Sequence, residues 1–172
     1  MPRRFALASM SPLILAITLI LIAIPIIFIT GAVASRRMLL APAFFLLVIY
    51  LWVWLRFRPR QFVIHGTDLE LIWPLKRQRF PRSTITVVEI IDRKKLRSMV
   101  GWGVRIGAGG LWGGFGWLWT RQRGIVCIYV SRIDEFVWIE RRSERPLLIT
   151  PDHMDDFVSA LAVRPSPAKK HQ

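Results

Sequence analysis

Two long stretches without charged residues constrain the fold of this chain more than any other feature. They cover residues 5–35 and 38–55, and most of their side chains are aliphatic or aromatic. A helix as long as the second stretch measures about 27 Å, close to the roughly 30 Å of a bilayer's hydrocarbon core. We therefore predict two transmembrane helices, over residues 12–33 and 38–55. Their short connection makes residues 1–58 an antiparallel hairpin.

Arginines at the ends of these stretches predict how the hairpin is oriented. The outer ends carry Arg3, Arg4, Arg56, Arg58 and Arg60, and the connection carries Arg36 and Arg37. Lys and Arg concentrate in the cytoplasmic segments of membrane proteins. We therefore expect both termini, and everything after the hairpin, to lie in the cytoplasm.

A cleavable signal peptide is the alternative interpretation of the first stretch. Basic residues precede it, and Ala32 and Ala34 fall where small residues precede a cleavage site. However, the apolar run is longer than the roughly 7–15 residues of a signal-peptide core, which favours a retained helix. Cleavage after Ala34 would leave the rest of the chain on the same side.

Composition excludes several other classes. The chain has 25 Lys and Arg against 11 Asp and Glu, yet 53% of it is hydrophobic, which is unlike a disordered chain. One cysteine rules out a disulfide framework. Three scattered histidines give no metal-ligand spacing and no catalytic pairing, so we expect no metal, no cofactor and no enzyme. Seven of the basic residues flank the apolar stretches, so the net charge of +14 does not require nucleic acid as a partner.

Beyond Pro59 the pattern changes to short apolar strands bounded by turn residues. We predict about seven strands, among residues 61–65, 69–73, 77–82, 86–92, 103–106, 124–131, 136–140 and 146–149. A helix follows, with Thr150 as N-cap and Pro151 at its first position, and it ends near Val163. Its spacing places Phe157 and Leu161 on one apolar face. The tail, residues 164–172, is predicted to be basic and disordered.

A glycine-rich segment, residues 101–119, stands in the middle of the β-rich part. Eight of the chain's 11 glycines fall there, interleaved with tryptophan and phenylalanine. The spacing fits neither a P-loop nor a dinucleotide-binding fingerprint. Two interpretations stay open. The segment is an aromatic-packed β-connection, or it lies in the membrane headgroup layer with Arg105, Arg121 and Arg123 beside it.

These residues resemble the bacterial pleckstrin-homology-like domains of small membrane-anchored proteins. The resemblance covers residues 60–163 and rests on a glycine motif, two apolar strands and a Thr-Pro-Asp helix start in the right order. The matching residues are Gly109, Gly110, Gly113, Phe115, Gly116, Pro151, Phe157 and Leu161. The resemblance implies a seven-stranded β-roll or barrel capped by the C-terminal helix, and a domain without catalytic activity.

Basic clusters in this domain are the candidate partner-facing residues. They are Lys76, Arg77 and Arg79; Arg93, Lys94, Lys95 and Arg97; and Arg105, Arg121 and Arg123. The lysine and Arg-x-Arg pattern of phosphoinositide-binding relatives is missing, because the first strand ends in His65 and its turn carries Asp68. Generic attraction to anionic lipid needs only charge, at about 1 kcal/mol per basic side chain. The alternative is that these clusters are solvated loops.

We therefore expect a multi-pass protein of the cell (inner) membrane, with a cytoplasmic interaction module that binds anionic lipid headgroups or a protein partner. A homo-oligomer is compatible with this hypothesis. The alternative is an accessory subunit of a larger membrane complex in which the hairpin is the working part. A membrane enzyme or transporter is disfavoured, because neither apolar stretch contains an ionisable residue.

Overall fold

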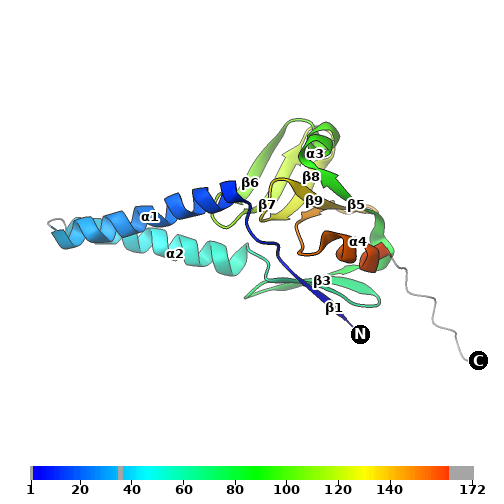
Figure 1. Cartoon of the computed structure of the whole chain (residues 1–172), viewed down its shortest axis with the longest axis horizontal. Helices are drawn as coiled ribbons and strands as arrows, with labels where there is room; N and C mark the ends of the chain where they lie inside the picture. The colour runs from blue at the N-terminus through cyan, green and yellow to red at the C-terminus, as the bar shows by residue number, and fades with distance from the viewer. Residues whose placement is uncertain (1, 35–36, 163–172) are drawn as a thin grey trace, which may run out of the picture.

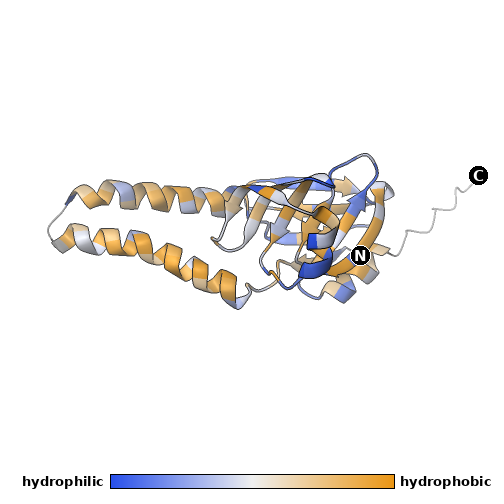
Figure 2. Ribbon diagram, turned by 90° about the horizontal axis from the view of Figure 1, so that it is seen from above, coloured by the Kyte–Doolittle hydropathy of each residue, from blue (hydrophilic) through white to orange (hydrophobic). Residues whose placement is uncertain are grey.

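The computed structural model describes residues 2–34 and 37–162, which form a helical hairpin and a β-rich domain (Figure 1). Helix α1 spans Pro12–Ala34 and α2 spans Leu40–Arg56, with the short 3-10 helix η1 (Arg37–Leu39) before α2. Both helices are long and apolar enough to cross a membrane, and few of their residues are buried. Figure 2 shows hydrophobic residues along both helices. Helices that are apolar on all sides and exposed are typical of membrane spans.

The β-rich domain contains two sheets. A four-stranded antiparallel sheet has the order β1 (Arg3–Ala6), β2 (Gln61–Ile64), β3 (Asp68–Ile72), β4 (Arg77–Pro81). A six-stranded sheet has the order β5 (Ile85–Asp92), β9 (Glu135–Arg141), β10 (Leu147–Ile149), β8 (Gly124–Val130), β7 (Gly114–Thr120), β6 (Gly103–Gly109). The 3-10 helix η2 (Arg82–Thr84) connects the two sheets. Only the β10–β8 pair is parallel.

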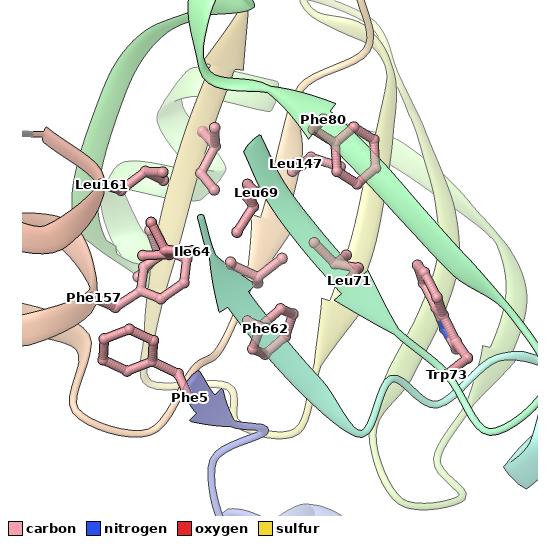
Figure 3. Packing of buried hydrophobic residues seen from close by; sticks show 13 residues of the cluster. Phe5, Phe62, Ile64, Leu69, Leu71, Trp73, Phe80, Leu147, Phe157 and Leu161 are labelled. Carbon is pink, nitrogen blue, oxygen red and sulfur yellow. The ribbon is translucent and has the colours of Figure 1, made fainter. Parts of the chain in front are cut away.

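The main core lies between the sheets and is closed by α4 (Met154–Ala162). It is formed by fully buried side chains of both sheets, including Phe62, Leu69, Ile139 and Leu147. Phe157 of α4 packs into it, as Figure 3 shows. Burying apolar surface on this scale is the dominant favourable term in folding. A second core lies on the opposite face of the six-stranded sheet, beneath α3 (Arg93–Val100).

The predicted fold class is confirmed: two apolar helices, a β-rich domain and a C-terminal helix. The described residues contain ten strands rather than about seven, because β1 and β7 were not predicted. Residues 93–100, which we considered as a loop, form a helix instead. Its apolar residues Leu96, Met99 and Val100 have helical spacing, a signal that the surrounding basic residues masked. The predicted tail, residues 164–172, lies outside the described residues.

The start of the C-terminal helix was predicted wrongly. The helix begins at Met154, and Pro151 instead forms an isolated β-bridge with Leu7. The Thr150 hydroxyl accepts a hydrogen bond from the Ser131 amide at 2.9 Å, so it does not cap a helix. Contacts with residues that are distant in the sequence therefore override the local Thr-Pro signal for the start of a helix.

Two attachments fix the domain to the hairpin. Strand β1 directly precedes α1 and pairs with β2, so the N-terminal residues and the domain lie at the same end of the hairpin (Figure 1). The second attachment is the turn between β6 and β7. Thr18 Oγ1 of α1 lies 3.0 Å from the Gly110 carbonyl oxygen and accepts a hydrogen bond from the Trp112 amide at 3.0 Å. Trp112 also packs edge-to-face on Trp54 of α2, with the ring centroids 4.8 Å apart.

Candidate functional site

The residues of the glycine motif lie where the backbone is most crowded. Gly109 ends β6, Gly110 and Gly113 form the turn, and Phe115 and Gly116 belong to β7. Phe115 is fully buried. A Cβ at Gly116 would lie 2.4 Å from the Ile106 carbonyl oxygen, so only glycine fits the β6–β7 pairing there. Trp117 and Trp119 of the same hairpin are exposed, which means that the segment is neither wholly core nor wholly surface.

The predicted basic residues form three separate groups. Lys76, Arg77 and Arg79 lie in the β3–β4 turn and on β4; Arg93, Lys94, Lys95 and Arg97 lie on α3; Arg105 lies on β6, with Arg121 and Arg123 in the β7–β8 turn. Helix α3 covers one face of the six-stranded sheet, and the four-stranded sheet covers the other. The groups on α3 and β4 therefore belong to opposite sides of that sheet and do not form one surface.

Several of these basic side chains have acidic partners within the domain. Lys95 Nζ lies 2.6 Å from a Glu89 carboxylate oxygen, and Arg123 pairs with Glu140 at 3.0 Å. Asp92 accepts a hydrogen bond from the Lys95 amide and so caps α3. These contacts give the α3 cluster a structural role beside any role in binding.

A cleft between edge strand β4 and strands β7 and β8 brings basic residues together. It has a volume of about 570 Å³, within the range of about 300–1,000 Å³ typical of ligand sites. Its basic lining residues are Lys76, Arg79, Arg141 and Arg145, against the single carboxylate of Glu144. Sequence reasoning missed Arg141 and Arg145. Nothing local distinguishes them from the other charges of the β9–β10 connection.

Arg141 is a structural member of this set. Its side chain is 5% exposed and stacks 4.5 Å above the Phe80 ring. Its Nε donates to the Arg145 carbonyl oxygen at 2.9 Å, and its guanidinium pairs with Glu144. Arg141 thus holds the β9–β10 turn in place. Lys76 and Arg145 are exposed and form no ion pair within the described part of the chain.

Cys127 and Tyr129 of β8 line the cleft beneath these cations. Burial raises the pKa of the Cys127 thiol, while the positive charges of Arg141, Arg145 and Lys76 oppose that rise. Burial also raises the pKa of Tyr129, to about 12. Arg141, Arg145 and Lys76 line the same cleft as the Cys127 thiol.

An apolar surface adjoins the cleft, formed by Val104, Ile106, Trp117, Trp119 and Ile125, which we call the apolar shelf. The strand register places these residues on one face, with Ile106 opposite Trp117 and Val104 opposite Trp119. Trp119 pairs in turn with Ile125 of β8. Each shelf side chain is more than a third exposed. Trp117 belongs to both the shelf and the cleft.

A second cavity adjoins the cleft at the end of the helical hairpin. This smaller cavity of about 130 Å³ shares Lys76, Trp117 and Tyr129 with the cleft and is also lined by Arg56 and Phe57. Trp73 Nε1 donates to the Phe57 carbonyl oxygen at 3.0 Å, which fixes the β3–β4 turn beside the end of α2. Because the two cavities share these three lining residues, we treat them together and call them the membrane-proximal cleft.

The opposite end of the four-stranded sheet offers a larger cavity of about 790 Å³. Its lining includes Arg82, whose guanidinium donates to the Leu161 carbonyl oxygen at 2.7 Å and to the Ala160 carbonyl oxygen at 3.1 Å. Burial lowers the pKa of Arg82. Because Arg82 holds the C-terminal end of α4, Arg142 is the remaining cation of the lining, and Asp68 adds a negative charge. The cavity is therefore less suited to an anion than the membrane-proximal cleft.

The described residues contain no group of three or more His, Cys, Asp or Glu side chains arranged to hold a metal ion. In comparison with known protein families, residues 60–165 fit a model described as bacterial PH domain. No curated protein and no solved structure gives a significant match.

Proposed function

The chain belongs to the bacterial PH domain family, and from this premise we propose that it is a membrane-anchored, non-enzymatic interaction module. We further propose that it works on the cytoplasmic face of the inner membrane and engages anionic lipid headgroups. The observation that carries this proposal is the membrane-proximal cleft, where the cations of Lys76 and Arg145 lie in a cavity that reaches the end of α2.

Electrostatics supports lipid as the partner. Each basic side chain near an anionic leaflet contributes about 1 kcal/mol. The hairpin holds the domain beside the bilayer, which raises the effective concentration of headgroups around it. Modest attraction by a few cations is therefore enough for occupancy, although the same attraction would be weak for a free domain.

The chemistry of the cleft supports a binding role rather than catalysis. The thiolate is the nucleophilic form of cysteine, and burial raises the pKa of Cys127 so that the thiol dominates at neutral pH. The nearest ionisable groups in the cleft are mainly cations, which bind anions but do not act as general bases.

Retention of lipid by the full chain tests the proposal. The chain is reconstituted with equal amounts of phosphatidylcholine and phosphatidylglycerol, extracted in a mild non-ionic detergent, and its bound lipids are quantified. We expect phosphatidylglycerol to be enriched over phosphatidylcholine at low salt, and the enrichment to fall as salt screens the cations. Equal retention of both lipids at all salt concentrations would contradict lipid engagement.

A protein partner is the second candidate, because β6 is an edge strand of the six-stranded sheet and carries exposed apolar residues. Such an edge can accept a further strand. The accessory-subunit alternative has less support, since Gly31 and Ala43, two of the three small residues that could pack against another membrane protein, are used within the hairpin, while Ala41 is exposed. Ala43 is buried there, and Gly31 lies against Leu39.

A further inference from the structure

The membrane-proximal cleft has two chemically different walls. One wall carries the cations of Lys76 and Arg145, and the other continues into the apolar shelf through Trp117. A small hydrophilic anion would use only the first wall. An apolar peptide would place its backbone beside unmatched charges. A ligand that uses both walls needs an anionic group joined directly to an apolar part.

The exposure of the apolar shelf indicates that a ligand or a membrane covers it. Trp119 is 58% and Ile106 is 55% exposed, and they lie side by side with Val104 and Trp117 on strands β6 and β7. Contiguous exposed apolar surface next to a polar rim usually marks a ligand or membrane contact. Exposed tryptophan is also the residue most suited to the boundary between acyl chains and headgroups.

The position of the cleft restricts the source of its ligand. The smaller cavity opens beside Arg56 and Phe57, where α2 ends. The β6–β7 turn contacts Thr18 and Trp54, so the shelf hairpin starts at the level of the apolar spans themselves. A membrane lipid can therefore reach the cleft without leaving the boundary of the bilayer completely.

We propose that the membrane-proximal cleft binds one anionic phospholipid, with its phosphate between Lys76 and Arg145 and its acyl chains along Trp117 and the apolar shelf. This inference rests on the proposed function and deepens it, because it replaces general attraction to a charged surface with a single lipid site. The phosphate matches the excess of cations, and the acyl chains cover the exposed tryptophans.

The only cysteine of the chain reports on occupancy, because Cys127 lines the cleft and is partly accessible. The full chain is placed in nanodiscs of phosphatidylcholine alone or with phosphatidylglycerol, and Cys127 is alkylated with iodoacetamide, which is uncharged. We expect phosphatidylglycerol to slow alkylation about tenfold when its effective concentration is about ten times Kd. Each variant is compared with itself in phosphatidylcholine, which cancels the effect of the substitution alone on the thiol pKa.

Two pairs of substitutions test the two walls. Lys76→Gln with Arg145→Gln, and Trp117→Ala with Trp119→Ala, should each bring the protection ratio close to one. Arg93→Gln with Lys94→Gln on α3, and Trp102→Ala outside the shelf, are the matched controls and should keep full protection. Loss of protection in the α3 control as well would mean a general surface-charge effect and would overturn the lipid site.

Soluble ligands separate the headgroup from the whole lipid. Inorganic phosphate or glycerol phosphate should protect Cys127 far less than phosphatidylglycerol, because neither covers the shelf. Equal protection by inorganic phosphate would reduce the site to an anion site and overturn the inference. If the chain retains phosphatidylglycerol but Cys127 is not protected, the lipid site is wrong while the proposed function stands. If no anionic lipid is retained, the proposed function fails as well.

Discussion

At the scale of single residues, Glu70 is a buried carboxylate held by two partners. It is 5% exposed, although it points to the outer face of β3. His65 Nε2 lies 3.1 Å from one carboxylate oxygen, and Arg79 Nε lies 3.2 Å from the other. The hydrogen bond to His65, followed by the hydrogen bond and charge of Arg79, lowers the pKa of Glu70 below its ordinary 4.5.

This lowered pKa predicts the sign of a pH effect. A carboxylate whose pKa is lower in the folded state stabilises the fold above its unfolded pKa, and the stabilisation is lost as pH falls through the folded pKa. Glu70→Gln should therefore cost about 1 to 3 kcal/mol at neutral pH and progressively less under acidic conditions. Thermal unfolding of the chain in nanodiscs of uncharged lipid, at a series of pH values from neutral to acidic, measures the loss of stability and its dependence on pH. Glu89→Gln, which breaks only the exposed pair with Lys95, should change stability by less than about 1 kcal/mol.

The glycine motif makes a second prediction at this scale, because its members are not equivalent. Gly113 and Gly116 have φ angles of +146° and +128°, and a Cβ would lie 2.2 Å from the Val130 carbonyl oxygen and 2.4 Å from that of Ile106. Alanine at either position should destabilise the domain by about 1 to 3 kcal/mol. A Cβ at Gly109 would lie 3.5 Å from the nearest atom, on the Arg105 side chain, so Gly109→Ala should stay within about 0.5 kcal/mol of the native chain in the same unfolding assay. A large loss at Gly109 would contradict this division.

At the scale of elements, the sequence predicts those whose pattern is uniform along their length. The apolar spans and the strands β8 and β9 were predicted because every residue agrees with one environment. Strand β1 contains two arginines, and β7 alternates glycine with aromatic residues, so neither gives a strand pattern. They form because β2 and β6 provide hydrogen-bonding partners, which is tertiary information.

The hydrogen bonds between Thr18 of α1 and the β6–β7 turn lead to a prediction about the stability of that turn. Thr18 is 2% exposed, and its hydroxyl contacts the backbone of Gly110 and Trp112. Thr18→Val keeps the shape of the side chain but leaves a buried amide without its acceptor, which costs about 1 to 3 kcal/mol. Amide hydrogen exchange in the β6–β7 turn should therefore be faster in this variant than in the native chain. Thr30→Val removes only a hydrogen bond within the helix, to Ile27, and should leave the turn unchanged.

At the scale of the whole molecule, the cleft illustrates what a sequence cannot provide. Lys76 and Arg79 were predicted as basic surface residues, and the β3–β4 turn places Lys76 beside the end of α2. Arg141 and Arg145 join them only because the end of strand β9 lies next to β4, where Arg141 stacks on Phe80. Charges from distant segments converge through sheet packing, and no local pattern in the sequence records that convergence.

The topology of the whole molecule is the last prediction. Because β1 pairs with β2, the N-terminal residues and the domain must lie on one side of the membrane, with the turn at Arg37 on the other. In a Cys127→Ser background, a membrane-impermeant maleimide should label Arg37→Cys in intact cells, but Arg3→Cys and Ser143→Cys only after lysis.

Each of the three labels has a distinct meaning for the architecture. Labelling of Ser143→Cys in intact cells would place the domain outside the cytoplasm and contradict the cytoplasmic site of action. Loss of the label from Arg3→Cys would mean that the first helix is cleaved, and the four-stranded sheet would then lose β1 and the contact of Phe5 with Phe157. Retention of that label on a full-length chain is expected, because the strand that precedes the first span is an integral part of the domain that follows the second.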